Sequence, residues 1–229
     1  MEATFKAIAD HALLVTFAEE MSEEAHAKVI ALDMALGADI PTGVIETVPA
    51  LVNLLVSFDP MATDHSTLQR DVRACLDGLK IQEKVGGRRS VQVCYEPPFA
   101  PDLDAVASST GLSVEAVINA HLAGNFQALM YGFAPGYAYL SGVPEQIQVP
   151  RKTKPVRDVP AGSVVIAGSQ CLITTLTMPT GWSSIGRSPT PIFTGDPSHP
   201  FLFDIGDHVT FERVDSTTFQ RLSQGRNHD

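Results

Sequence analysis

The first part of the chain alternates between short strand-like runs and helical patterns. "TFKAIADHALLVTF" (residues 4–17) reads as two short strands around a turn. Residues 22–37 repeat apolar positions at helical spacing, with Ser22 placed to cap the helix and Gly37 placed to end it. This stretch therefore predicts a hairpin followed by an amphipathic helix.

The same arrangement repeats further along. Residues 44–48 and 51–58 are strand-like, and the run ends at Asp59 and Pro60. A second amphipathic helix follows, and its apolar stripe consists of Leu68, Val72, Cys75, Leu76 and Leu79. The order strand–strand–helix–strand–strand–helix predicts a compact α+β unit, an α/β sandwich-like domain.

A polar segment separates this unit from the rest. "EKVGGRRS" (residues 83–90) is basic and holds two glycines, which is typical of a domain boundary. We expect one domain over residues 1–86 and a second over residues 87–229, beginning with a strand in "SVQVCYE".

Two short helices are predicted next, within residues 101–124. They are broken at Gly111, and Ser113 is placed to cap the second. The pair has the outline of a helix-turn-helix. The second helix, "SVEAVINAHLAG", carries no Lys or Arg that could contact phosphate or guanine, which argues against DNA binding.

After Gly124 the pattern changes to short β-prone runs between glycine and proline turns. These runs are "FQALMYGF", "SVVIAG", "CLITTLT", "TPIFTG" and "DHVTFERV". Many short strands with regular turn signals predict a small β-barrel or sandwich. The fold class is therefore α+β.

Composition and motif content exclude several classes of function. A formal net charge of −10 repels nucleic-acid backbones. The chain has no apolar run long enough to span a bilayer, and "MEATFKAIAD" does not resemble a signal peptide. Three widely spaced cysteines fit a reducing cytoplasm. Phosphate-loop, dinucleotide, serine-hydrolase and zinc motifs are absent from the sequence.

One stretch stands out by composition. "GFAPGYAYLSGVP" (residues 132–144) combines glycines, prolines and aromatic rings in a pattern that predicts a loop. Gly136 would let the backbone approach a ligand, and Pro135 would stiffen the turn. Phe133, Tyr137 and Tyr139 could form an apolar wall for a small molecule. The alternative is a rigid barrel corner with the rings packed inward.

Four motifs carry a resemblance to a known family. They are "GFAPGYAYL", "PRKTKPVRDVPAGSVVIAGSQ", "MPTGWSSIGRSP" and "DIGDHVTF". The chain resembles the family of the 5-oxoprolinase B subunit, also called the sporulation kinase inhibitor or allophanate hydrolase subunit 1 family. The resemblance implies an N-terminal α+β domain followed by a cyclophilin-like β-barrel.

The resemblance also implies an activity. Members act with a second protein, the 5-oxoprolinase C subunit, and use ATP to activate 5-oxoproline; a ring-opening protein then completes its conversion to glutamate. We therefore expect one part of an ATP-dependent hydrolase that is inactive alone, with ATP and Mg²⁺ bound together with the partner. Two alternatives stay open. They are the carboxyltransferase half of a biotin-dependent urea carboxylase and a non-catalytic inhibitor of a histidine kinase.

Five further residues are candidates in the matched motifs. His121 could be a general acid or base, or a helix-end residue that interacts with the helix dipole. Arg151 and Arg187 could each bind a carboxylate or phosphate, Arg187 being favoured as catalytic over a surface ion pair. Gln170 could bind an amide substrate or make a turn contact. Trp182 could stack on a ligand, although a core or interface anchor is the more common role.

The chain departs from the family pattern at three positions near these candidates. Thr180 replaces a glycine, Leu172 replaces a glycine after Gln170, and Thr174 stands where the family has a tyrosine. A leucine in place of glycine closes space near the backbone, and the missing tyrosine removes a hydroxyl. These changes bear on the substrate and not on the fold.

Overall fold

The computed structural model describes residues 3–79 and 86–224, and the chain divides into two compact units, residues 1–84 and 85–229. Part of the predicted boundary segment, residues 83–85, lies outside the described residues. Each unit has its own hydrophobic core.

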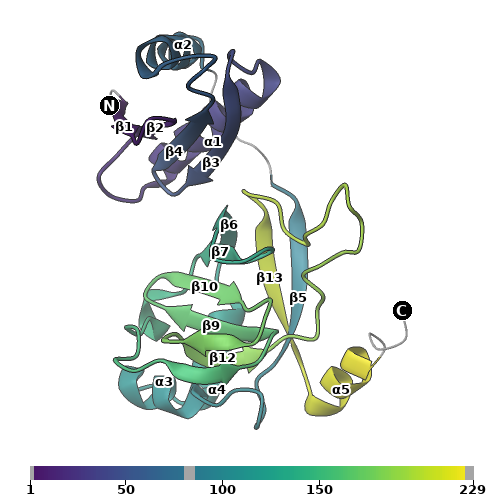
Figure 1. Ribbon diagram of the computed structural model, residues 1–229. Helices are drawn as coiled ribbons and strands as arrows, with labels where there is room; N and C mark the ends of the chain where they lie inside the picture. Colours follow the sequence, from purple (N-terminus) through teal and green to yellow (C-terminus); the bar gives the residue numbers. More distant parts are fainter. Residues whose placement is uncertain (1–2, 80–85, 225–229) are drawn as a thin grey trace. The chain divides into compact units, whose positions relative to one another are not determined.

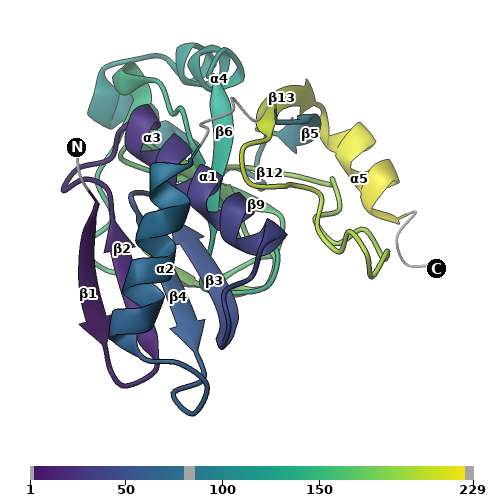
Figure 2. The same ribbon diagram turned by 90° about the horizontal axis from the view of Figure 1, so that it is seen from above.

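The first unit is a four-stranded antiparallel sheet covered on one face by two helices. Its strands are β1 (Thr4–Ile8), β2 (Ala12–Thr16), β3 (Val44–Ala50) and β4 (Asn53–Phe58), in the spatial order β1-β2-β4-β3. Helices α1 (Glu23–Ala38) and α2 (His65–Asp77) lie across this sheet (Figure 2). The predicted element order is confirmed.

The core of this unit forms where the predicted apolar stripes meet. Leu32 of α1, Leu54 of β4 and Leu68 of α2 are fully buried in one cluster. The Ser22 side chain accepts a hydrogen bond from the Ala25 N–H, as the capping prediction requires. Gly37 does not end the helix, because α1 continues through Ala38.

The second unit is a closed seven-stranded barrel in the order β10-β7-β6-β13-β5-β12-β9 (Figure 1). Its strands are β5 (Arg88–Cys94), β6 (Phe126–Tyr131), β7 (Ala138–Ser141), β9 (Ser163–Ala167), β10 (Gln170–Ile173), β12 (Ser183–Arg187) and β13 (His208–Val214). Strands β5 and β13 pair in parallel, so the beginning and the end of the unit lie side by side.

Smaller elements complete the unit. Helices α3 (Leu103–Thr110) and α4 (Val114–Leu122) pack their apolar faces into the barrel core, a 3₁₀ turn spans Glu145–Ile147, and α5 (Ser216–Gln224) follows the last strand. Strands β8 (Val156–Val159) and β11 (Met178–Thr180) form a separate two-stranded sheet. The α+β class and the barrel are confirmed.

Three sequence predictions for this unit need correction. The run "TPIFTG" forms no strand, only an isolated bridge between Phe193 and Phe201. The loop predicted over residues 132–144 contains β7, in which buried and partly exposed residues alternate. Helix α5 and strand β12 lie in segments for which the sequence pattern predicts neither.

Candidate functional site

Four of the predicted aromatic residues and Arg151 come together in one row, here called the aromatic row. Ring centroids are 5.3 Å apart for Phe133 and Tyr137, 5.8 Å for Tyr137 and Tyr139, and 6.0 Å for Tyr139 and Trp182. The Arg151 guanidinium lies 5.4 Å from the centre of the Trp182 ring. Segments far apart in the sequence thus meet on the barrel.

Most of this row is packed rather than open. Tyr137 and Trp182 are buried against Val165, Ala167 and Leu172, side chains of β9 and β10 that lie outside the main barrel core cluster. The Tyr137 hydroxyl donates a weak hydrogen bond to the Met178 sulfur, and burial raises its pKa to about 12. Tyr137 and Trp182 therefore pack on the face of β9 and β10 opposite the barrel core, and the roles of the row in binding stay predictions.

Phe133 is the exposed ring of the aromatic row. Its side chain is 72% exposed, and its backbone φ is +69°. A residue other than glycine rarely adopts that conformation, so the turn holds this ring outward against a local conformational preference. The Pro135 carbonyl of the same turn accepts a hydrogen bond from the Thr175 hydroxyl at 3.1 Å.

Gly136 lies where a side chain would be both crowded and conformationally strained. Its φ is +71°, and a Cβ there would lie 3.1 Å from the Phe201 ring and 3.2 Å from a methyl group of Ile192. The glycine thus permits the turn to pack against the segment after β12. The predicted close approach is to the protein's own side chains.

Arg187 lies at the end of β12, where it pairs in register with Ser163 of β9 and Cys94 of β5. Next to it, the Gly162 carbonyl accepts the Ser188 N–H at 2.7 Å. A Cβ on Gly162 would lie 2.7 Å from the Ser188 carbonyl oxygen, and its φ is +82°. The "PAGS" motif therefore needs its glycine to bring β9 against the end of β12.

The Arg187 guanidinium is only partly satisfied. Its Nε donates to the Ala161 carbonyl at 3.1 Å, and its centre lies 5.9 Å from the Phe219 ring of α5. No carboxylate among the described residues forms an ion pair with it. Burial lowers its pKa. The surface ion pair that the sequence left open is therefore absent from the described part of the chain.

A cavity of about 340 Å³ opens beside this guanidinium. We call it the Arg187 cavity; its walls include Gly162, Thr175, Arg187, Ser188, Ile192 and Phe219. Its size falls in the range of small-molecule sites, and its walls are mostly apolar with a few polar groups. None of the aromatic row lines it. Of the predicted site residues, only Arg187 does.

Two departures from the family pattern have structural roles. Thr174 also lines this cavity, and its hydroxyl accepts the Ser163 N–H at 2.9 Å and donates to the Pro160 carbonyl at 2.8 Å. Leu172 is buried beneath the aromatic row. Gln170 begins β10, pairs with Ala167 and does not line the cavity.

His121 lies inside the barrel, with its side chain completely buried. Its Nδ1 is 2.7 Å from the Tyr95 hydroxyl oxygen and its Nε2 is 3.7 Å from the Cys171 sulfur. Burial lowers its pKa to about 3, so the ring is neutral at physiological pH. This position fits neither a solvent-facing acid–base role nor a charged residue at a helix end, the two roles that the sequence left open.

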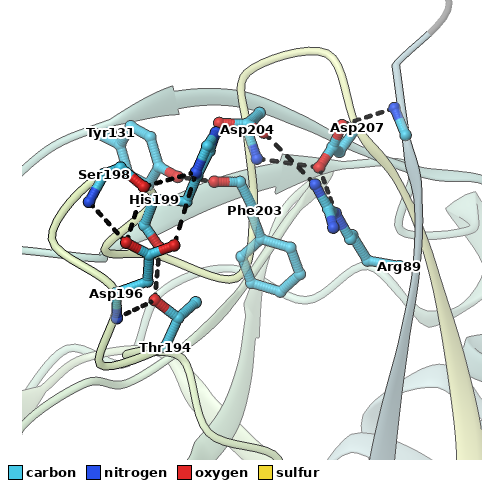
Figure 3. Close-up of polar contacts among 10 residues, drawn as sticks. Arg89, Tyr131, Thr194, Asp196, Ser198, His199, Phe203, Asp204 and Asp207 are labelled. Carbon is cyan, nitrogen blue, oxygen red and sulfur yellow. Dashed lines mark hydrogen bonds and ion pairs between the residues drawn. The ribbon is translucent and has the colours of Figure 1, made fainter.

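A second polar site lies outside the residues predicted from sequence. Asp207 is buried, and its carboxylate accepts hydrogen bonds from Arg89 Nε at 2.7 Å, Gly87 N–H at 2.7 Å and Asp204 N–H at 2.9 Å (Figure 3). We call this group the Asp207 network. The "DIGDHVTF" motif contains Asp207, but its partners near "GGRR" are more than a hundred residues away.

The loop before this network is held by its own polar groups. Asp196 accepts hydrogen bonds from the Ser198 N–H and hydroxyl, and the Thr194 hydroxyl donates to the His199 carbonyl (Figure 3). The Tyr131 hydroxyl donates to the Phe203 carbonyl from the neighbouring strand β6. These contacts shape the segment whose first residues line the Arg187 cavity.

Neither a cluster of metal ligands nor a membrane-spanning helix is found in the described part of the chain. Residues 3–79 and 86–224 hold no cluster of three His, Cys, Asp or Glu side chains able to bind a metal ion. No helix among them is both long and apolar enough to span a membrane.

Comparison with known proteins defines the class. The family described as carboxyltransferase domain, subdomain C and D, matches residues 3–203. The urea amidolyase of K. lactis shares the fold, with a TM-score of 0.81 at 17% identity over 98% of this chain and 16% of its own. The protein TTHA0988 aligns with a TM-score of 0.80 at 32% identity over 90% of this chain. This chain spans only 40% of the length of TTHA0988.

Individual relatives place the chain in a smaller family within this class. The 5-oxoprolinase B subunit of Bacillus subtilis is 32% identical over 231 residues, covering 96% of each chain. A protein of the same name from Escherichia coli is 32% identical over 76% of this chain and 79% of its own. The chain belongs to the carboxyltransferase subdomain C and D family and, within it, to the family of the 5-oxoprolinase B subunit.

Proposed function

We propose that this chain is one subunit of an ATP-dependent 5-oxoprolinase, which converts 5-oxo-L-proline to L-glutamate. The observation that carries the proposal is the match to the Bacillus subtilis B subunit, which covers 96% of both chains. A protein of that name is one part of a multi-subunit enzyme. We propose two partners, a protein like the 5-oxoprolinase C subunit (the C-type partner) and a ring-opening protein, assembled in the cytoplasm and inactive apart.

The chemistry explains why several proteins would cooperate. A five-membered lactam is a stabilised amide, and ATP would supply a phosphoryl group that turns its oxygen into a leaving group. The enzyme must hold a substrate carboxylate and disperse developing negative charge, which arginine and backbone N–H groups do well. In this chain, Arg187 lines a cavity of suitable size and has no carboxylate partner among the described residues.

We assign the nucleotide site to the partner. The sequence has no phosphate-binding loop, and the described residues provide no set of acidic or histidine ligands for Mg²⁺. We therefore propose that ATP and Mg²⁺ bind with residues of the C-type partner. This chain would bind and orient the lactam.

A second candidate function follows from the family description. Carboxyltransferase domains share this fold, so the chain could form half of a biotin-dependent carboxyltransferase that acts on urea or another small amide. The likeness to urea carboxylase is 17% in sequence and concerns the fold alone. The identity of 32% to proteins named as the 5-oxoprolinase B subunit favours the first proposal.

The decisive experiment is reconstitution. The chain would be purified alone and together with a genomically adjacent C-type partner and a ring-opening protein, and ADP and glutamate would be measured with and without 5-oxo-L-proline. We expect both products only when all components and the lactam are present. ADP release that ignores 5-oxo-L-proline but responds to urea or another amide would overturn the proposed substrate.

A further inference from the structure

Arg187 differs from two other arginines on the strands of the barrel, Arg89 and Arg213. Arg89 pairs with Asp204 and Asp207, and Arg213 pairs with Glu115. Arg187 is partly buried yet has no carboxylate partner among the described residues, and only its Nε has a hydrogen-bond acceptor. Removing a charge from water without a partner is unfavourable, so such a group is suited to bind an anion.

The geometry points to a carboxylate-binding site in the Arg187 cavity, with the two free Nη groups of Arg187 donating to the two oxygens of a small ring acid. This inference rests on the proposed function and adds where the lactam substrate lies and which end is held. The Nε contact to the Ala161 carbonyl fixes the plane of the guanidinium. A planar fork held in this way matches the two oxygens of a carboxylate.

A carboxylate suits this site better than a phosphate group. Arg187 is the one Lys or Arg among the described residues that line the cavity, and the chain as a whole carries a net charge of −10. A phosphate carries more negative charge and usually needs several cations or a nest of backbone N–H groups. One guanidinium balances one carboxylate.

The rest of the cavity provides for an uncharged ring. Ile192, Phe193 and Phe219 offer apolar surface. The hydroxyls of Ser188 and Thr190 each accept a backbone N–H, from Thr190 and Gln92, and in the described residues neither has an acceptor for its own proton. Each hydroxyl can therefore donate to an oxygen of the ring, such as the lactam oxygen.

Helix α5 makes a wall of the cavity that lies beyond the residues matched by the family. Phe219 and Ser223 line the cavity from this helix, and the family match ends at residue 203, before the helix begins. The Phe219 ring also packs beside the guanidinium that would hold the carboxylate. We therefore assign to Phe219 the limit on ring size, with Arg187 setting the preference for an acid.

The test measures binding to the full chain, alone and with the C-type partner, by isothermal titration calorimetry. The probes are 5-oxo-L-proline and its carboxamide, which keeps the ring and lacks the carboxylate. We expect the acid to bind at least tenfold more tightly than the amide, equivalent to about 1.4 kcal/mol. Inorganic phosphate is the third probe and should not compete.

Variants test which residues cause the preference for the acid over the amide. Arg187→Gln should abolish the preference for the acid over the amide, and Arg187→Lys should retain part of it. Arg213→Gln is the matched control, because that arginine forms an exposed pair with Glu115 and does not line the cavity. Phe219→Ala should weaken binding of 5-oxo-L-proline and improve binding of the six-membered homologue, 6-oxopiperidine-2-carboxylate.

The outcomes separate this inference from the proposed function. Equal binding of acid and amide, competition by phosphate, no binding in either state of the chain, or full preference in Arg187→Gln would overturn the carboxylate site. Turnover by the reconstituted enzyme that is unchanged in Arg187→Gln would overturn the site and leave the function standing. Acid-selective binding that depends on Arg187, without turnover, would support the site and count against the proposed reaction.

Discussion

Two arginines of the same barrel have opposite electrostatic environments. Arg89 donates to Asp207 at 2.7 Å, and this hydrogen bond raises its pKa, whereas burial without a carboxylate lowers the pKa of Arg187. Both lie on barrel strands, β5 and β12, that are neighbours in the sheet. The sheet therefore positions both, and the surrounding side chains decide which charge is satisfied within the chain.

The difference separates the structural role of Arg89 from the ligand-binding role that we propose for Arg187. In the Asp207 network both oxygens of a buried carboxylate accept hydrogen bonds from groups of this chain, so the carboxylate holds the fold together. Arg187 keeps two donor groups and an adjacent cavity. A paired arginine thus indicates a structural contact within the fold. An unpaired arginine beside a cavity indicates a candidate ligand-binding site.

The largest expected effect is a loss of stability when the ion pair between Arg89 and Asp207 is broken. Asp207→Asn leaves Arg89 and two backbone N–H groups without their charged acceptor, which should lower the free energy of unfolding by about 3 kcal/mol. Urea unfolding followed by fluorescence of Trp182, the chain's one tryptophan, reports on the barrel unit. Asp204→Asn, at an exposed carboxylate, is the control and should cost less than about 1 kcal/mol. Equal midpoints for wild type and Asp207→Asn would show that the network is not structural.

In the wild-type protein, acid should remove the contribution that the Asp207 carboxylate makes to stability. Burial alone would raise the pKa of the Asp207 carboxyl, but hydrogen bonds from Arg89, Asp204 N–H and Gly87 N–H lower it overall. A lowered pKa gives stability that is complete above the unfolded value, about 3.9, and that is lost as pH falls through the folded value.

The measurement compares wild type with Asp207→Asn by urea unfolding at a series of pH values between neutral and strongly acidic. We expect a constant difference in unfolding free energy above about pH 5 and a shrinking one below about pH 4. A difference that grows on acidification would contradict the sign of this linkage.

A smaller effect should follow from making the unpaired arginine resemble the paired one. Ser223→Glu places a carboxylate on the α5 wall of the Arg187 cavity, where it can pair with the guanidinium. Binding of 5-oxo-L-proline should weaken about tenfold or more, because the ligand must then displace an internal anion. Ser223→Gln has the same size without the charge and should bind within about threefold of wild type. Similar losses in both variants would indicate crowding rather than charge.

The smallest expected effect is on stability at Arg187 itself. In Arg187→Met the lost hydrogen bond to the Ala161 carbonyl is offset by removing an unpaired charge from a partly buried position. The free energy of unfolding should stay within about 1 kcal/mol of wild type. Arg89→Met should cost more, because it leaves the buried Asp207 without its cation. A loss above about 2 kcal/mol in Arg187→Met would assign Arg187 a structural role.

The first unit could be predicted from sequence because its signals are local. The Ser22 cap and the apolar stripe through Leu32 lie within one helix, so period and capping suffice. In the barrel, β7 is only four residues long and sits between glycines, and too few positions remain for a period to show. Helix α5 is mostly polar, with Phe219 as its one buried residue.

Some residues of the candidate site could likewise be predicted from sequence, and others could not. Arg187 could be found from its motif, because the resemblance marks it directly. Phe219 could not, since its part in the cavity depends on how α5 folds back beside the end of β12. The aromatic side chains within residues 132–144 are neighbours, but sequence cannot say which face of a barrel wall a ring covers. Tyr137 and Trp182 lie against β9 and β10 instead of the cavity.

The parallel pairing of β5 with β13 has a consequence for how the protein is made. Gly87 and Asp207, at the start of this pairing, are 120 positions apart, so the barrel cannot close while the ribosome is still adding the last strand. Until then the edges of β5 and β6 that β13 covers are open, and exposed edges are where chains aggregate. Closure by such distant segments is intrinsically slow. Until β13 is available, a nascent chain of this protein therefore exposes these two strand edges, although most core residues of the barrel are already present.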